Sequence, residues 1–368
     1  MKFYSFFFIL LLTIFPVFSQ STITFDDSNI EAAVRKSIRK ETGDITAEEV
    51  KQIKKLRLGD QQISSFKGIK QLVNLQEIGL YGATIESFAG LTDLPNLKKL
   101  NIASSNITTV HKLAKLTSLQ ELYLHENSIE DISPLKNLTA LEKLTLSGNN
   151  ISDISVVADL KKLTVLAIEN NPIKDISAVS ELTELTVLKF GYTEVTSIAP
   201  IAKLSNLVRI SMTKLAVTDI SALSNLQKLE KLWMHSNKKV TEISALKDLI
   251  HLNELGIQFC NIHDIQPLEK LTKLKKLDIN NNRIATIAVL KNLTNLEWLT
   301  MNENQISDIS ALTELTHLRH LSASKNTISD LKPLLNLTTN LESVNLYGNP
   351  IQKDKSFEKI SNLIEVRI

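Results

Sequence analysis

The stretch LEKLTLSGNNISDISVVADLKK, residues 141–162, holds the pattern that decides the fold. Leu144 and Leu146 alternate with polar residues, which is typical of a short strand with one face turned toward a core. Asn149 then turns the chain, and its amide can both donate to and accept from backbone groups of neighbouring turns. Ile151 points back inward. The stretch therefore predicts one strand, one turn and a return path, with too little apolar surface to form a core alone.

The return path has its own signal, and the whole pattern recurs along the chain. Asp153 with Ser155 can cap a short helical or 3₁₀ turn. The pattern L-x-x-L-x-L-x-x-N-x-I occurs fourteen times, with first residues at Ile53, Leu75, Leu97, Leu119, Leu141, Leu163, Leu185, Leu207, Leu229, Leu252, Leu274, Leu296, Leu318 and Leu341. Successive units start 22 residues apart, except for two steps of 23 that contain an extra residue in SNKKV and NLTTNLES.

A fixed period of this length indicates a repeat array, and this pattern is that of a leucine-rich repeat. Because no unit can bury its own apolar face, neighbours must stack at roughly 4.8 Å per parallel strand to form a continuous core. We therefore predict an α/β solenoid: a leucine-rich-repeat horseshoe of about 14 repeats with a parallel β-sheet on its concave side and a helical N-terminal cap.

The composition changes at the ends of the array and sets the expected segments. We predict a signal peptide at residues 1–19, an N-terminal helical cap at 20–52, the repeats at 53–352 and a C-terminal cap at 353–368. The first 19 residues, MKFYSFFFILLLTIFPVFS, have one Lys and then an uncharged apolar run, as in a cleavable secretory signal. An uncleaved membrane anchor is the alternative. No second apolar run of membrane length follows, so we expect no integral membrane segment after cleavage.

Both caps have helix signals. Ser28 with Glu31 predicts a capping box at the first helix, and Gly43 its stop. Thr46 with Glu49 predicts a second box. At the other end, DKSFEKISNLIEVRI predicts a short helix that carries Phe357, Ile360 and Leu363 toward the core.

Charge and chemistry exclude several classes of function. The chain has 42 basic and 40 acidic residues, and loss of Lys2 with the signal leaves a net charge of +1. Such a balance gives no electrostatic reason to bind nucleic acid. No phosphate loop, nucleophile elbow or metal-ligand spacing is discernible, so we expect no enzyme activity, catalytic residue, metal or cofactor. The only cysteine, Cys260, takes the Asn position of its unit, where a structural role is expected.

A family resemblance rests on residues 29–80, which begin NIEAAVRKSIRKETGD, and on repeats such as NSIEDISPLKNLTALEKLTLSGNNISDIS. These resemble the internalin-type leucine-rich-repeat proteins of bacterial surfaces, including their helical N-terminal cap. The resemblance implies an exported protein that binds other proteins through a curved sheet. The sequence departs from the better-known members in having no C-terminal immunoglobulin-like module and no wall-attachment signal.

The repeat register assigns the third, fifth and seventh positions of each unit to the concave face and the eighth to its rim. Both tryptophans, four of the five tyrosines and three of the seven histidines take these positions, where the fold would accept Ser, Thr or Lys. The predicted partner-binding residues are Tyr81, Tyr123, His125, Tyr192, Trp233, His235, Phe259, Trp298, His320 and Tyr347. Because Trp and Tyr dominate protein interfaces, this set predicts a binding face for a protein or glycoprotein.

Other interpretations of this set stay open. Strand positions favour aromatic residues by propensity, and neighbours on one face can simply pack together. The main functional hypothesis is an exported, secreted or cell-surface recognition or adhesion module. The alternatives are an intracellular scaffold resembling the leucine-rich-repeat regulators of protein phosphatase 1 and a purely structural envelope protein. The identity of the partner and the oligomeric state are not contained in the sequence.

The Asn column has gaps that mark a candidate irregularity. The ninth position is occupied by another residue at Gln61, Ala83, Ser105, Thr193, Leu215 and Cys260. The gaps at Thr193 and Leu215 are consecutive and lie beside the units that contribute Tyr192 and Trp233. We expect a local irregularity in the curvature of the solenoid there.

Overall fold

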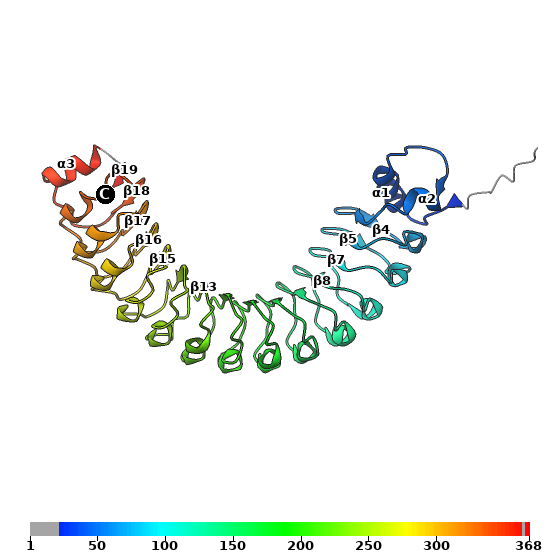
Figure 1. The fold of residues 1–368 in the computed structure, drawn as a ribbon, viewed down its shortest axis with the longest axis horizontal. Coiled ribbons are helices and arrows are strands. Elements are labelled where there is room, and N and C mark those ends of the chain that lie inside the picture. Colours follow the sequence, from blue (N-terminus) through cyan, green and yellow to red (C-terminus); the bar gives the residue numbers. More distant parts are fainter. Residues whose placement is uncertain (1–21, 363–364) are drawn as a thin grey trace, which may run out of the picture.

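The structure is a computed structural model that describes residues 22–362 and 365–368. Figure 1 shows an arc of stacked turns, with strands along its inner side and short helical turns along its outer side. The predicted signal peptide, residues 1–19, lies outside the described residues. None of the described helices is long and apolar enough to cross a membrane.

One parallel sheet lines the concave side, and every strand pairs with the strand of the next unit. The described strands of this sheet are β3 (Lys55–Arg57), β5 (Glu77–Gly79), β7 (Lys99–Asn101), β8 (Glu121–Tyr123), β9 (Lys143–Thr145), β10 (Val165–Ala167), β11 (Val187–Lys189), β12 (Arg209–Ser211), β13 (Lys231–Trp233), β14 (Glu254–Gly256), β15 (Lys276–Asp278), β16 (Trp298–Thr300), β17 (His320–Ser322), β18 (Ser343–Asn345) and β19 (Glu365–Arg367). The predicted horseshoe is confirmed, and each of the fourteen units contributes one strand.

The convex side consists of 3₁₀ turns. They are η1 (Ile69–Gln71), η2 (Leu91–Asp93), η3 (His111–Lys115), η4 (Ser133–Asn137), η5 (Ser155–Asp159), η6 (Ser177–Glu181), η7 (Ala199–Ile201), η8 (Ser221–Asn225), η9 (Ser244–Leu246), η10 (Gln266–Leu268), η11 (Ala288–Asn292), η12 (Ser310–Glu314) and η13 (Lys332–Leu334). At η5, the Ser155 N–H donates to Asp153 Oδ1 at 2.7 Å, as the sequence predicts. Because a 3₁₀ turn is short along the chain and narrow, it fits a 22-residue repeat.

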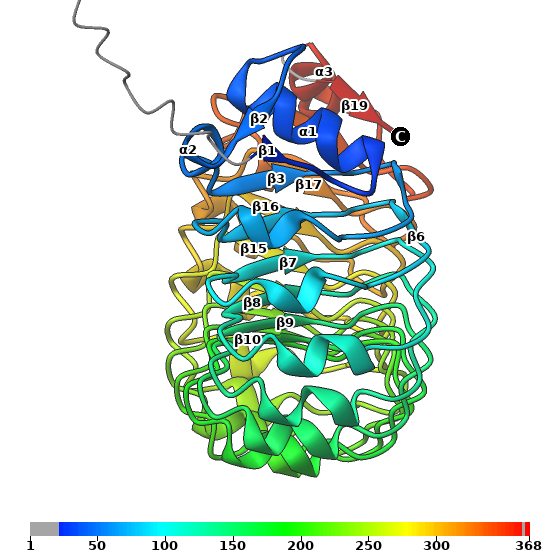
Figure 2. The same ribbon diagram turned by 90° about the vertical axis from the view of Figure 1, so that its right-hand side faces the viewer.

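The Asn residues of the ninth column tie neighbouring units together inside the stack. Asn149 donates to the carbonyl oxygens of Leu124 and Leu146 at 3.0 and 2.8 Å, and its Oδ1 accepts from the Ile129 N–H at 3.0 Å. Each such amide satisfies three buried backbone groups that would otherwise lack partners. Figure 2 shows the units stacked in regular order along the arc.

The hydrogen bonding of the Asn column is interrupted at Thr193. Thr193 donates its hydroxyl to Phe190 O at 2.8 Å, within its own unit. An Asn at position 193 would accept a hydrogen bond from the Ile173 N–H. This N–H donates to Asn171 O at 2.8 Å instead. The next Asn, Asn237, accepts from the Leu215 N–H at 3.0 Å and so resumes the column.

The eighth position of every unit has a left-handed backbone, a feature that the sequence analysis missed. All fourteen residues have φ between 53° and 75°, including Gly148 at 69°, Tyr192 at 56° and Phe259 at 53°. Glycine and asparagine take this conformation readily, whereas it is uncommon for bulky side chains. The rim of the concave face is therefore a place where an aromatic residue is conformationally unfavourable.

The N-terminal cap consists of β1 (Thr22–Ile23) and β2 (Ile45–Thr46), which pair antiparallel, with α1 (Ser28–Ile38) and α2 (Ala47–Val50). A second small parallel pair, β4 (Gln62–Ile63) with β6 (Thr84–Ile85), lies in the first two units. Helix α1 packs against β3 and β4. Ile30 and Val34 are fully buried, so the cap covers the end of the core.

Two cap predictions are wrong and one is confirmed. The N-cap of α1 is Asp27 rather than Ser28, because the Asp27 carboxylate accepts from the N–H groups of Asn29 and Ile30. The helix ends at Ile38 and is followed by left-handed Arg39, so Gly43 lies four residues too late to stop it. The Thr46–Glu49 capping box of α2 is present: the Thr46 side chain accepts from the Glu49 N–H, and the Glu49 side chain accepts from the Thr46 N–H.

The C-terminal cap contains the predicted helix and an additional strand. Helix α3 (Lys355–Ser361) buries Ile360 and packs Phe357 partly against the core. Leu363 lies outside the described residues. After it, β19 pairs parallel with β18, which adds a fifteenth strand to the described sheet.

Asp27 also fastens the N-terminal cap to the first repeat. Its Oδ2 accepts from the Ser64 N–H at 2.7 Å and from the Ser64 hydroxyl at 2.8 Å. Burial raises the pKa of Asp27, but the hydrogen bonds from Ser64, Ile30 and Asn29 outweigh it, and the net pKa lies below 3.8. The charged carboxylate is therefore the form that the folded cap prefers.

We expect Asp27→Asn to lower the free energy of unfolding by about 1–2 kcal/mol at neutral pH, because a weaker acceptor replaces a charged cap. A carboxyl with a lowered folded pKa stabilises above its unfolded pKa, and this contribution is lost as the pH falls through the folded value. Urea melts of both proteins should therefore differ at pH 7, and the difference should shrink as the pH falls below the ordinary Asp value of 3.8 and vanish below the folded pKa. A difference that stays constant down to pH 2 would contradict the role of the charge.

Candidate functional site: the concave aromatic face

The strand register places the predicted binding residues on the concave face or its rim. Within β16, for example, Leu299 is buried while Trp298 and Thr300 lie on the other side of the sheet. Five of the ten predicted residues are largely exposed: Tyr81 (51%), Tyr192 (53%), Phe259 (45%), Trp298 (44%) and Tyr347 (60%). The other five, Tyr123, His125, Trp233, His235 and His320, are half-buried. Their neighbours separate them into distinct groups.

The first group surrounds Tyr123 in the N-terminal half. The Tyr123 hydroxyl donates to Glu121 at 2.8 Å, and Lys99 Nζ lies 5.2 Å from the centre of its ring. Burial raises the pKa of Glu121, but hydrogen bonds from Lys143, Tyr123 and Lys99 outweigh this effect and lower it to about 2. Burial and then Glu121 raise the pKa of Tyr123 to about 12. The charged and polar groups around Tyr123 therefore bond to one another within the group.

The second group lies at the centre, where Trp233 of β13 is paired with Gly256 of β14. The His235 ring occupies the space over Gly256, and any Cβ at that position would clash with it. His235 Nδ1 is the one fully buried side-chain polar atom of the described residues that has no hydrogen-bond partner. Burial lowers the pKa of His235 despite the nearby Asp278, so the ring is neutral at pH 7.

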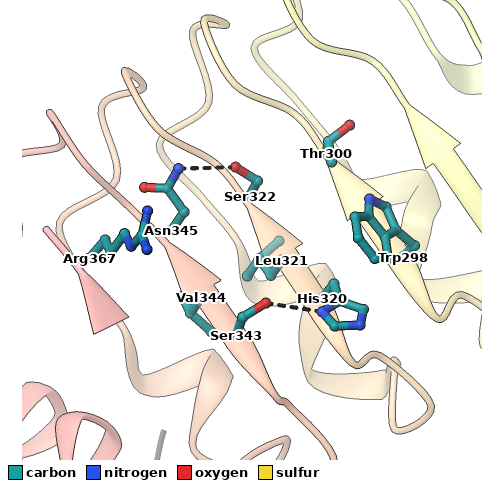
Figure 3. A pocket seen from close by; sticks show the side chains of 9 residues that line it. All are labelled: Trp298, Thr300, His320, Leu321, Ser322, Ser343, Val344, Asn345 and Arg367. Carbon is teal, nitrogen blue, oxygen red and sulfur yellow. Dashed lines mark hydrogen bonds between the residues drawn. The ribbon is translucent and has the colours of Figure 1, made fainter. Parts of the chain in front are cut away.

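The third group forms a pocket near the C-terminal end of the concave face (Figure 3). This C-terminal pocket has a volume of about 290 Å³ and is lined by Trp298, Thr300, His320, Leu321, Ser322, Ser343, Val344, Asn345 and Arg367. The Trp298 and His320 ring centroids are 4.3 Å apart with a 46° tilt. His320 Nδ1 and Ser343 Oγ are 3.0 Å apart, which fixes the histidine ring.

The pocket results from a change of side-chain size along the third-position column. Trp298 and His320 form an aromatic wall, and the following residue in the column, Ser343, is small. Thr300, Ser322 and Asn345 of the fifth position add hydroxyl and amide groups, and Asn345 donates to Ser322 at 3.3 Å. Arg367 of β19 completes the lining. The result is an apolar wall with polar groups around it.

The sequence analysis identified the wall of this pocket but not its small and polar lining. Ser343, Asn345 and Arg367 were not predicted as site residues. Ser343 and Asn345 are small polar residues at outward positions, as in many other units, so only the contrast with Trp298 and His320 marks them. Arg367 could not have been found, because the strand that carries it was predicted as part of a helical cap.

Ser343, His320 and Glu342 have the composition of a hydrolytic triad, since His320 Nε2 also lies 3.4 Å from Glu342 Oε2. Acyl transfer needs free backbone donors where the oxyanion develops. Ser343 lies in β18, between β17 and β19, and its N–H donates to Arg319 O at 3.3 Å. Glu342 is also bound by the Arg319 guanidinium. These contacts hold the His320 ring in its orientation beside the pocket.

Comparisons with known proteins agree with this architecture. Two family models, described as "Leucine Rich repeats (2 copies)" and "Leucine rich repeat", match residues 95–137, 139–181 and 250–292, and residues 272–328. The internalin InlF of Listeria monocytogenes is 34% identical, with a TM-score of 0.82 over 87% of this chain and 95% of that chain. The chain belongs to the internalin family of leucine-rich-repeat proteins. A search of curated proteins found no match.

Two other solved structures resemble this internalin-family chain over different shares of its length. Internalin C2 of Listeria monocytogenes is 28% identical with a TM-score of 0.56, and the match covers 59% of this chain and 98% of that one. A leucine-rich-repeat protein of Leptospira interrogans is 20% identical with a TM-score of 0.65, over 88% and 97% of the two chains. At that identity the likeness concerns the fold alone.

Cys260 occupies an interior position in the ladder of this internalin-family chain. Cys260 is buried and its Sγ lies 3.5 Å from Met234 O, in the place of a ladder Asn. Burial raises the pKa of the Cys260 thiol to about 11, so the reactive thiolate is scarce at neutral pH. The described residues contain no group of three His, Cys, Asp or Glu that could hold a metal ion.

Proposed function

We propose that this internalin-family chain is an exported recognition or adhesion module that binds a protein or glycoprotein on its concave face. The observation that carries the proposal is Trp298, which stays 44% exposed on the sheet beside the C-terminal pocket. An indole in this position contributes little to the core. Exposed tryptophans beside a pocket are typical of interface hot spots.

The volume and chemistry of the C-terminal pocket favour a single apolar side chain of the partner as its occupant. A space of about 290 Å³ is close to the size of one large side chain, and Trp298 offers it a flat apolar surface. Ser322, Ser343 and Asn345 could then bond the partner's backbone. Trp233, near the middle of the arc, would serve as a second anchor.

The fold and the surface charge support a protein ligand over a polyanion. A leucine-rich-repeat ectodomain of this architecture, the plant peptide hormone receptor RGFR1, was solved in complex with RGF2; it is 19% identical, with a TM-score of 0.65 over 82% of this chain and 52% of that one. On this concave face lysines alternate with glutamates, as in the Lys99–Glu121–Lys143 chain. A mixed face suits a partner with its own mixed surface.

Export is the second part of the proposal and has a separate test. Residues 1–19 have the composition of a secretory signal. The internalin InlF is one of the similar proteins of known structure. Sequencing of the mature N-terminus should give Gln20 or a near neighbour. A chain that retains Met1 inside the cell would instead favour an intracellular scaffold.

The binding proposal is tested by screening residues 20–368 against a panel of extracellular proteins. Each partner found is then tested for competition with an excess of free N-acetyl-tryptophanamide and N-acetyl-phenylalaninamide, which can fill the C-terminal pocket. We expect at least one specific partner with a dissociation constant in the micromolar range or tighter. A panel that yields no partner would count against the recognition role.

A further inference from the structure

We propose that the rim of the concave face carries a second, independent binding site, a groove around Tyr192 that takes a neutral carbohydrate. The groove crosses the loops that follow β9 to β12 and has a volume of about 550 Å³. Its lining includes Asn150, Asn170, Pro172, Tyr192, Glu194 and Lys214. Ligand pockets in proteins typically span about 300–1,000 Å³.

Tyr192 is the first reason to look for a ligand here. Its φ of 56° is unfavourable for a bulky residue, and its side chain is 53% exposed. Glycine, asparagine or serine takes the same rim position in other units, so the fold does not require a tyrosine. All fourteen units share the left-handed backbone, so what distinguishes Tyr192 from most of them is its exposed aromatic ring. Lys214 Nζ lies 5.5 Å from the ring centre and helps to hold the ring in place.

The polar lining of the groove is the second reason. The side-chain amides of Asn150 and Asn170 make no hydrogen bond to any described residue, whereas their neighbours Asn149 and Asn171 are fully used in the ladder. The carboxylate of Glu194 has one weak ion pair, 3.6 Å from Lys174. Amides and carboxylates at this spacing offer both donors and acceptors to a ligand rich in hydroxyl groups.

These features together fit a sugar better than a peptide or an anion. The C–H face of a pyranose ring stacks on an aromatic ring, and its hydroxyls bind to amides and carboxylates. Only Tyr192 and Pro172 are apolar in this lining, so the groove offers little to an apolar peptide side chain. The lining contains one acidic and one basic side chain, Glu194 and Lys214, which favours a neutral ligand over an anionic one.

The groove lies at the gap in the Asn column, because Thr193 is one of its lining residues. At Thr193 a short side chain, bonded to Phe190 O within its own unit, replaces the long amide. The site is distinct from the C-terminal pocket, since the two share no lining residue. The proposal therefore does not rest on the protein-binding function.

The test is saturation-transfer NMR and calorimetry of residues 20–368 with cellobiose, lactose, N,N′-diacetylchitobiose and mannobiose. We expect at least one of them to bind with a dissociation constant on the order of 10 mM or tighter. Tyr192→Asn removes the ring and keeps a residue type that tolerates a left-handed backbone. We expect it to weaken binding at least about tenfold.

Phe259→Asn is the matched control, because Phe259 has the same rim position, a φ of 53° and an exposed ring, but lies outside the groove. This variant should bind the sugar as the parent does. Both variants must melt like the parent. Failure of all four sugars to bind, or equal loss in the two variants, would overturn the proposal. A Tyr192→Asn variant that loses a protein partner but no sugar would show that the ligand class is wrong.

Discussion

A variant with both Trp233→Ala and Trp298→Ala is expected to bind its protein partner about 1,000-fold more weakly than the parent. Each tryptophan at an interface hot spot contributes about 2 kcal/mol or more, which is roughly 30-fold in affinity. Trp298 is 44% exposed, and Trp233 is half-buried in β13, where its strand neighbour is Gly256. Titration calorimetry or surface plasmon resonance measures the change.

The control for this variant is Val73→Ala with Ile250→Ala. These residues are 50% and 46% exposed, and neither occupies an outward strand position. The control removes exposed apolar side chains without touching the concave face, and its affinity should stay within about twofold of the parent. Both double variants should keep the parent's melting temperature. If the two double variants lose affinity equally, the tryptophans are not anchors.

The second large effect is on stability, from Asn237→Ala. Asn237 is fully buried, donates to Met212 O and Met234 O at 2.9 and 2.7 Å, and accepts from the Leu215 N–H at 3.0 Å. Its removal leaves three buried backbone groups without partners. Each unsatisfied group costs about 1–3 kcal/mol, and water relieves part of this cost. We therefore expect the free energy of unfolding to fall by about 3–4 kcal/mol. Urea unfolding followed by circular dichroism measures it.

Asn150→Ala is the matched control for the ladder, because the Asn150 side chain is exposed and makes no hydrogen bond to any described residue. It should change the free energy of unfolding by less than about 0.5 kcal/mol. In a solenoid each unit is stabilised mainly by its neighbours, so the Asn237 variant should loosen the units on either side first. Equal stability of the two variants would contradict the structural role of the ladder.

The fold could be predicted because the repeat leaves few alternatives. The 22-residue period, with apolar residues and Asn at the spacing of Leu144, Leu146 and Asn149, recurs in fourteen units. A unit that departs from the pattern can therefore still be assigned from its neighbours. The caps lack this redundancy. Asp27 and Ser28 are both good N-cap residues, and the choice between them depends on Ser64, which is distant in sequence and bonds only Asp27. Arg39, rather than Gly43, ends α1 in a left-handed conformation.

The sequence could predict which residues of the candidate site face outward, but not how they are grouped. Aromatic residues at outward positions were visible in the sequence, but their separation into three groups depends on neighbours one unit away. Gly256 makes room for His235, and Ser343 opens the pocket beside Trp298 and His320. The position of Arg367 depends on β19, a strand that forms only because β18 offers it an edge. The left-handed backbone of the eighth position could not be predicted, because different residue types occupy that position in different units.

Hydrogen–deuterium exchange of residues 20–368, with and without a partner from the screen, tests the central claim most directly. Binding on the concave face should slow exchange in peptides that contain the strands from β13 to β18, with the largest change around Trp298 and His320. The 3₁₀ turns from η8 to η13 should exchange as in the free protein. Protection confined to those turns or to the caps would show that the partner binds elsewhere and that the outward tryptophans serve the fold.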